Sequence, residues 1–295
     1  MHSEYFAGIA KYDYVGLAAP IDASSTLAFS LIRFGVDDIP NTLELIDANG
    51  NISYDRIKSF SVADYAFLFS YAKKSSKVGL RYGANVKIIH RIVGEFAKAW
   101  GFGLDVGVQY DLGTWKFGAM ARDITSTFNA WSFNTEPLEE VFTITGNEIP
   151  QNSLEITLPK LLLGVGKKVN FHEKISLYSE LNLDITFDGM RNVLIKSDPI
   201  SIDPHLGIEL GYAGIVFLRA GIGNIQKSTN IDRETITTVQ PNMGVGVKIK
   251  FITIDYALTN IGQAIGLYSN VFSLKLDINR GVFSHKYEQR PLLDE

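Results

Sequence analysis

The stretch ISLYSELNLDITFD, Ile175–Asp188, decides the fold class. Its apolar residues take alternate positions from Ile175 to Phe187, broken only by Ser179, and three carboxylates stand among the positions between them. Successive side chains of a β-strand point to opposite faces of the sheet. The stretch therefore predicts a strand with one apolar face and one charged face.

The same alternation recurs in Val78–Ile88, Leu104–Asp111, Val239–Lys250 and Phe272–Ile278. Several of these segments exceed the roughly 5–6 residues of a typical strand in a soluble domain. They match the roughly 9–11 residues that a tilted strand needs to cross a bilayer. In a soluble protein the apolar face would be a core, whereas in an outer-membrane barrel it would meet lipid. Their length favours the barrel.

The connections between strands alternate in length, which is typical of an up-and-down barrel with short periplasmic turns and longer outer loops. Tight turns are predicted at Asp22–Ser25, Ala72–Lys77, Asp111–Gly113, Val169–Lys174, Ala213–Gly214 and Phe251. Long connections are predicted at Asp37–Phe60, Arg91–Trp100, Thr125–Asn152, Gly189–Pro199, Gln226–Ile236 and Ile261–Tyr268. Aromatic residues gather beside the tight turns, as expected for a girdle at one bilayer interface.

Composition narrows the functional classes. The chain has 295 residues, of which 46% are hydrophobic and 20% charged, with a net charge of −4 and no cysteine. No run approaches the roughly 18 apolar residues of a membrane helix, so any membrane span must come from a closed barrel. The absence of cysteine excludes disulfides, thiolate metal sites and a Cys nucleophile. With no basic stripe and no GxSxG signature, we expect no nucleic-acid partner, no enzyme activity, no cofactor and no metal site.

The twelve connections separate thirteen strands, whereas single-chain bacterial barrels have an even number. We therefore expect a 14-stranded transmembrane antiparallel barrel whose N-terminal strand and plug segment are missing from this chain. Met1–Glu4 also lacks the basic and apolar regions of a signal peptide. The predicted organisation is a barrel over residues 1–278 and a polar C-terminal tail over 279–295.

Strand parity assigns a set of charged side chains to the lumen. These are Arg81, Lys87, Asp105, Arg122, Glu180, Asp184, Asp203, His205, Arg219 and Lys248. Their mixed signs indicate a lumen braced by ion pairs, because charges removed from water need partners. A path for a substrate is the alternative interpretation.

The predicted loop Thr125–Asn152 is the strongest candidate for partner recognition. It contains Phe128, Trp131 and Phe133, followed by Phe142 in a short helix expected around Pro137–Phe142. Long loops often carry function, and exposed aromatic residues can anchor a partner. The alternative is that these aromatic side chains fold back and plug the mouth of the barrel.

Five stretches resemble one family of membrane proteins: Arg33–Thr42, Asn129–Phe133, Thr145–Pro150, Thr186–Asn192 and Phe217–Asn224. Together they look like the PorV/PorQ family of Bacteroidota outer-membrane barrels, over most of the chain. The resemblance implies a FadL-like barrel in the outer membrane of a Gram-negative bacterium. It also implies a role in type IX protein secretion, with outer-membrane lipid and either the translocon or cargo C-terminal signal domains as partners.

Two functional hypotheses follow. The first is a component of type IX secretion that binds or shuttles cargo or translocon partners through its extracellular loops. The second is a FadL-like outer-membrane channel for hydrophobic solutes. A channel needs an apolar pocket that leads to an opening, whereas a shuttle needs an occluded lumen and aromatic outer loops.

Overall fold

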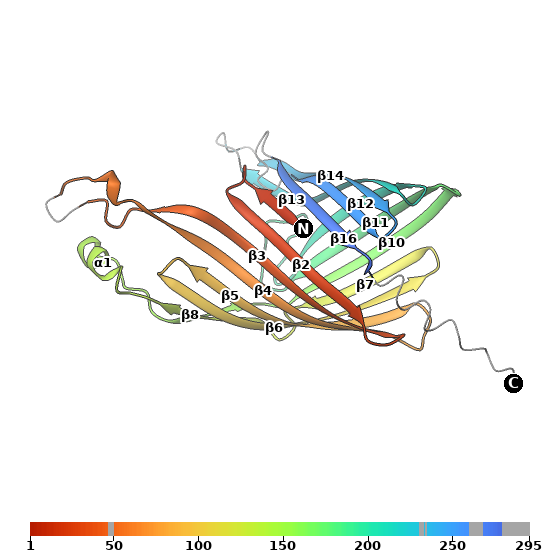
Figure 1. Cartoon of the computed structure of the whole chain (residues 1–295), viewed down its shortest axis with the longest axis horizontal. Coiled ribbons are helices and arrows are strands. Elements are labelled where there is room, and N and C mark those ends of the chain that lie inside the picture. The colour runs from red at the N-terminus through yellow and green to blue at the C-terminus, as the bar shows by residue number, and fades with distance from the viewer. Residues whose placement is uncertain (47–49, 230–232, 234, 260–267, 279–295) are drawn as a thin grey trace.

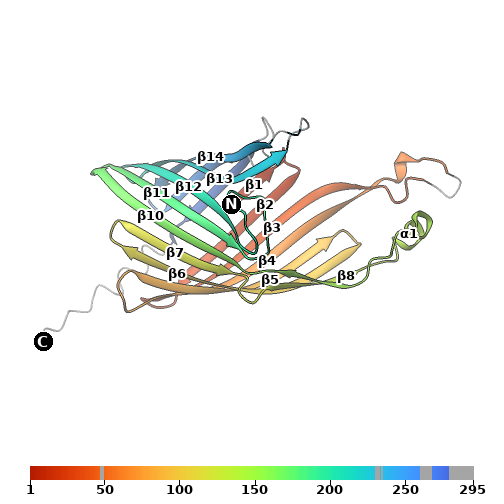
Figure 2. The ribbon, with the colours of Figure 1, turned by 180° about the vertical axis from the view of Figure 1, so that it is seen from behind.

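The computed structural model describes residues 1–46, 50–229, 233, 235–259 and 268–278 of the chain. Almost all of its regular structure is β (Figures 1 and 2). The strands are β1 His2–Tyr5, β2 Ala10–Pro20, β3 Ser25–Asn41, β4 Lys58–Lys74, β5 Leu80–Val93, β6 Ala97–Leu112, β7 Trp115–Arg122, β8 Thr127–Phe133, β9 Ser153–Thr157, β10 Lys160–His172, β11 Ile175–Thr186, β12 Ser201–Tyr212, β13 Val216–Thr229, β14 Thr235–Ile249, β15 Ile252–Thr259 and β16 Ser269–Leu276. A 3-10 turn, Tyr54–Arg56, and the helix α1, Glu139–Thr145, complete the list.

The strands form one closed, antiparallel, transmembrane barrel. Most strands pair with their neighbours along the chain, and β1 pairs with both β2 and β16, which closes the ring. The strands β7 and β8 lie end to end along β6, and β9 and β10 continue one another beside them. The 16 strands therefore occupy 14 positions in the wall. The predicted 14-stranded, all-β barrel is confirmed.

The prediction that the N-terminal strand is missing was wrong, because β1 fills that position. Its three register pairs with β16 run from His2 with Phe272 to Glu4 with Asn270. Phe6, Ala7 and Gly8 turn the chain with φ values of 53°, 58° and 88°. Phe and Ala rarely adopt positive φ, so Gly8 is the one residue of the three that signals a turn, and the first two strands read as one.

Several predicted loops are shorter than expected because strands extend into them. Between Arg91 and Trp100, β5 runs to Val93 and β6 starts at Ala97, so this connection is a tight turn and the prediction of a long loop was wrong. Much of Thr125–Phe133, predicted as the first part of the loop Thr125–Asn152, is the strand β8. The short helix expected near Pro137 is present slightly later, as α1. The tail 279–295 and most of the loop Ile261–Tyr268 lie outside the described residues.

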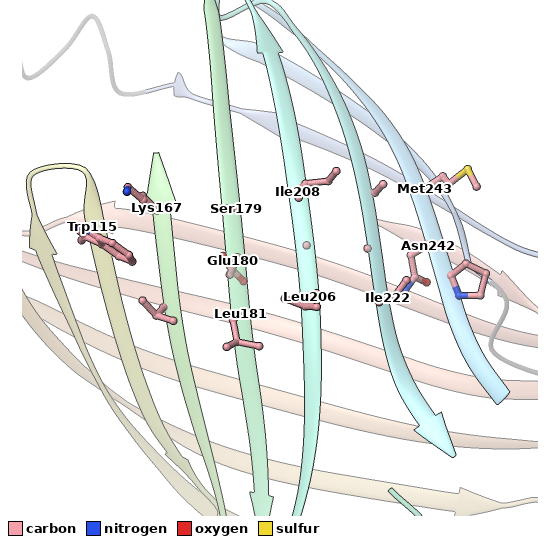
Figure 3. A pocket seen from close by; sticks show the side chains of 15 residues that line it. Trp115, Lys167, Ser179, Glu180, Leu181, Leu206, Ile208, Ile222, Asn242 and Met243 are labelled. Carbon is pink, nitrogen blue, oxygen red and sulfur yellow. The ribbon is translucent and has the colours of Figure 1, made fainter. Parts of the chain in front are cut away.

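The outer face of the barrel is apolar. Leu206 on β12 and Met243 on β14 are 53% and 66% exposed, although both are large and apolar. Figure 3 shows outward side chains of β10 to β14, among them Lys167, together with Trp115 of β7 and the inward residues Glu180 and Asn242. Water would penalise such a surface, whereas lipid does not, so the apolar band is the membrane-facing surface.

The turn between β2 and β3 is held by one carboxylate. The backbone N–H groups of Ser24 and Ser25 donate to Asp22 Oδ1 at 2.7 and 2.8 Å, and the Ser24 hydroxyl donates to the same oxygen at 2.8 Å. These bonds lower the pKa of Asp22 to about 2. The turn therefore keeps its carboxylate ionised at any ordinary pH.

The wall is higher on one side than on the other. The strands β3 and β4 have 17 residues each, and β6 has 16, so this part of the sheet extends beyond the rest of the barrel. In Figures 1 and 2 the long strands, β8 and α1 project together past the rim. Among the described residues, no helix is long and apolar enough to cross a membrane.

The assignment of inward and outward faces predicts that a charged side chain destabilises the barrel much more at one position than at the position next to it. Leu181 belongs to the outward set of β11, and Leu181→Arg should destabilise the barrel by about 2–4 kcal/mol if it lies near the bilayer midplane. Asn182 points inward and donates to Glu180 Oε1 at 2.5 Å. Asn182→Arg should cost much less, because Glu180 and Asp184 flank it. Urea unfolding in lipid vesicles measures both; an equal or larger cost at Asn182 would contradict the assignment.

Candidate functional site

The inner face of the barrel is identified by contacts that span several strands. Arg91 on β5 bonds Glu155 on β9 at 2.9 Å, although β6 and β8 lie between them. Side chains separated by two strands meet only on the concave side of a curved sheet. Residues that pair across neighbouring strands lie on the same face of the sheet. The strand register therefore identifies the inward residues of the other strands in the ring.

All of the charged residues predicted for the lumen lie on this inner face by register. The structure brings most of them into ion pairs with residues on the same or neighbouring strands. Arg219 reaches Glu209 at 2.6 Å and Asp255 at 2.5 Å. Arg81 pairs with Asp111. No ion pair joins Arg122 or Lys248 to another described residue.

A second group of paired charges lies on β10 to β12. Lys160 Nζ is 2.6 Å from Asp184 Oδ2. His205 Nε2 lies 3.6 Å from Asp203 and 3.9 Å from Asp184, so it stands between two carboxylates. Asp203 Oδ1 is buried and accepts no hydrogen bond from the described residues. This group is thus the least satisfied part of the charged wall.

The most buried charges form a cluster at the break between β7 and β8. Lys87, Asp105 and Asp123 are 7%, 3% and 7% exposed. Lys87 Nζ lies 2.7 Å from Asp105 and also bonds Asp123, which accepts a further bond from the Thr127 hydroxyl. The backbone N–H of Asp123 donates to Asp105 at 2.9 Å. One lysine thus bridges two carboxylates and fixes the bulge between Arg122 and Thr127.

The predicted lumen set leaves out five of the residues in these ion pairs. Asp111, Asp123, Lys160, Glu209 and Asp255 complete the ion pairs, and all except Asp123 lie on the inner face by register. Asp111 and Glu209 share the parity of predicted lumen residues on β6 and β12, so the parity signal was sufficient to find these two, whereas β10 and β15 carry no predicted lumen residue. Asp123 lies in an irregular bulge, where parity carries no information.

The other side of the lumen is aromatic. Tyr12 and Tyr14 of β2 and Ile32 and Phe34 of β3 point inward, because Tyr12 pairs with Phe34 and Tyr14 with Ile32. Tyr14 and Phe34 are 38% and 39% exposed. In the ring, β3 is seven positions from β12, which carries Asp203 and His205. The lumen therefore has an apolar, aromatic side and a charged side across from it.

Glycine keeps the inner face hollow. A cavity of about 510 Å³ lies on it, and its lining includes Gly83, Gly107, Gly118 and Gly164 from four adjacent strands together with Met120. At Gly83 an added Cβ would come within 2.8 Å of the Tyr71 carbonyl oxygen, so that position requires glycine. At Gly118 and Gly207 an added Cβ would meet nothing within 4 Å. At these positions the missing side chain leaves space in the lumen.

The outer face carries a separate, shallow groove of about 600 Å³ (Figure 3). Leu181, Leu206, Ile222 and Met243 line it, and Trp115 stands at one end with Lys167 Nζ 4.8 Å from its ring. Most of its lining residues belong to the lipid-facing set, and the inner-face residues Glu180 and Asn242 also border it. The groove therefore opens on the lipid-facing surface of the barrel.

The aromatic residues predicted for partner recognition divide between the two faces. Trp131 and Phe133 share the inner face of β8 with the buried Asn129, whereas Phe128 lies on the outer face and is 42% exposed. Phe142 lies on α1. The structure therefore does not bring the four side chains together, and their role in recognition stays a prediction.

Trp131 belongs to a polar cluster near the rim. Its Nε1 donates to Glu155 Oε2 at 2.8 Å, and the guanidinium of Arg91 lies 4.9 Å from its ring centre. Arg91 also bonds Asp64 at 2.9 Å. Beside this cluster is a cavity of about 480 Å³, lined by Val93, Phe96, Trp131, Phe133, Leu138 and Pro150 among others.

Comparison with solved structures finds bacterial transporters. The chain is similar to the toluene transporter TbuX of Ralstonia pickettii (12% identity, 93% of this chain and 86% of that one, TM-score 0.48). It is also similar to the toluene transporter TodX of Pseudomonas putida (13%, 92% and 84%, 0.48) and to a FadL homologue of Pseudomonas aeruginosa (12%, 90% and 76%, 0.47). No family model and no curated protein matches the chain.

Removing the lysine of the buried cluster should be costly. Lys87→Met leaves Asp105 and Asp123 facing each other without a counter-charge, and breaking a buried ion pair on one side costs about 3–5 kcal/mol. Lys116→Met is the matched control, since Lys116 lies on the same inner face but is exposed. Urea unfolding of both variants in vesicles compares them. The cluster would lose its assigned role if Lys87→Met cost no more than Lys116→Met.

Proposed function

We propose that the chain is an outer-membrane channel for hydrophobic or amphipathic solutes in a Gram-negative bacterium. The observation that carries the proposal is the two-sided lumen. Tyr14 and Phe34 offer an apolar track, and the charged strands across the ring offer partners for a polar end group.

The space in the lumen supports the same proposal. Inward glycines such as Gly118 and Gly207 leave room in the lumen that larger side chains would occupy, and a barrel of 14 strands is wider than the roughly eight-stranded barrels that side chains just fill. The charges that line the lumen are mostly paired with one another, as described above. A neutral or amphipathic molecule can pass such a wall without breaking the ion pairs of the lumen, which would be energetically costly. The wall therefore favours such a molecule over a small ion.

A filled-lumen variant tests the channel. Gly118→Trp combined with Gly207→Trp places two indole rings inside the barrel, where the missing side chains leave space. Uptake of radiolabelled decanol and decanoate by cells that carry the protein in their outer membrane should fall several-fold.

The control is Ala119→Trp combined with Ile208→Trp, which adds the same rings one residue along each strand, on the lipid-facing side. It should leave uptake unchanged. Heat-modifiability on gels reports folding of each variant. If the folded inward variant transports as well as the unaltered protein, or if the unaltered protein adds no uptake over empty cells, the channel proposal fails.

A second candidate is the role in type IX secretion that the sequence resemblance implies. The projecting part of the sheet, with β8 and α1 beyond the rim, is the observation that favours it. In this role the outer segments would bind translocon or cargo signal domains, and Phe128, Trp131 and Phe133 would supply rigid aromatic contacts.

Replacing these three aromatic residues by Ser should weaken co-isolation of translocon or cargo from native outer membranes. Folding is followed on the same samples by heat-modifiability. A folded triple variant that keeps its full set of partners would move recognition elsewhere. Loss of folding would be traced to Trp131, because its bond to Glu155 ties β8 to β9.

A further inference from the structure

The strand β9, Ser153–Thr157, has one unpaired edge. It pairs with β8 on one side, and all five of its residues are exposed. On the other side the next strand would be β11, but β11 ends at Thr186, opposite Lys160. Within the part of the chain that the structure describes, no backbone hydrogen bond links that edge to another segment. The edge therefore presents free N–H and C=O groups.

The edge lacks several of the usual protections against pairing, although the strand is short and Glu155 places a charge on its inner face. Natural edge strands are commonly blunted by proline, by lysine or by a bulge. The sequence Ser-Leu-Glu-Ile-Thr contains no proline and no lysine, and its register with β8 is regular. Pro150 and Pro159 stand outside it at either end. The exposed stretch is thus limited in length but open along its whole extent.

Space for another strand lies beside the edge. A cavity of about 440 Å³ is lined by Ile156, Thr157 and Leu158 on one side. Thr186, Asp188 and Arg191 line the other side. The cavity continues the line of β11 towards the rim, where an added strand would run.

The side chains of β9 define what would fit. On the outer face, Phe102, Phe128 and Ile156 stand in one cross-strand row, and Leu154 is exposed two residues from Ile156. On the inner face Glu155 stands between them. A strand added to this edge would place apolar residues beside Leu154 and Ile156 and one residue opposite Glu155, where a cation is favourable.

We propose that β9 is a docking edge for an extended peptide segment of another protein, added as a further strand and carrying the pattern apolar–basic–apolar. Main-chain hydrogen bonds would give the affinity and alternate side chains the specificity. A second copy of this chain fits poorly, because antiparallel pairing centred on β9 would set Glu155 against Glu155. The proposal goes beyond passage of a solute and does not depend on it.

The probe is a fluorescent peptide, TVTVKVT, titrated onto the purified protein in lipid nanodiscs and followed by anisotropy. Two further versions of this peptide carry backbone N-methyl groups. In one version the three valines are N-methylated. In the other version the lysine and the threonines at the third and seventh positions are N-methylated. Each set of methyl groups blocks hydrogen bonding along one edge of the peptide. Only one of the two should lose binding, by about tenfold or more, since several hydrogen bonds are lost together.

Variants of the chain locate the site. Glu155→Gln should weaken TVTVKVT by about 1.5- to 5-fold, the range expected for a cross-strand charge pair, and should leave TVTVTVT unaffected. Ile156→Lys should weaken both peptides, whereas Ala130→Lys, on the paired strand β8, should weaken neither. Heat-modifiability confirms that each variant is folded.

Several outcomes would overturn the proposal. Equal binding of the two N-methylated peptides would show that side chains, not an edge, hold the probe. No binding of the unmodified probe, or binding insensitive to Ile156→Lys, would remove β9 as the site. Self-association that Ile156→Lys abolishes would assign the edge to a second copy of the chain.

Discussion

The structure depends on the need to pair every backbone polar group where there is no water. In a bilayer core an unpaired N–H or C=O has no partner, so a sheet that crosses it must close on itself. Here closure is achieved by β1, a strand of four residues that pairs with β2 and β16. Once the ring is closed, the alternation of side chains along each strand places one set against lipid and the other set in the lumen.

The charged lumen follows from that geometry. Inward charges are partly removed from water, and they are stable only with partners. The chain meets this need locally: Lys87 serves two carboxylates, and Arg219 serves two more. The aromatic residues of β2 and β3 need no such partners, and together with the inward glycines they leave the space on which the channel proposal rests.

The regular part of the wall could be predicted from the sequence, and the irregular part could not. Parity assigned Glu180, Asp184 and Arg219 to the face where the structure has them, because a strand repeats every two residues. It failed at Phe6–Gly8, where ordinary residues adopt positive φ, and at Asp123, where a bulge breaks the period. The segment Thr127–Phe133 was assigned to the long loop Thr125–Asn152, although its pairing with β6 makes it a strand.

The short closing strand also has a consequence for the kinetics of assembly. Ser3 bonds the backbone of Asn270, 267 positions away, so the last pairing joins almost the two ends of the described chain. The entropy of closing so long a loop must be overcome before this contact contributes, and contacts between distant residues slow folding. Three register pairs stabilise the closed state only weakly against that entropy. We therefore expect the pairing between β1 and β16 to form last during folding and to separate first during unfolding.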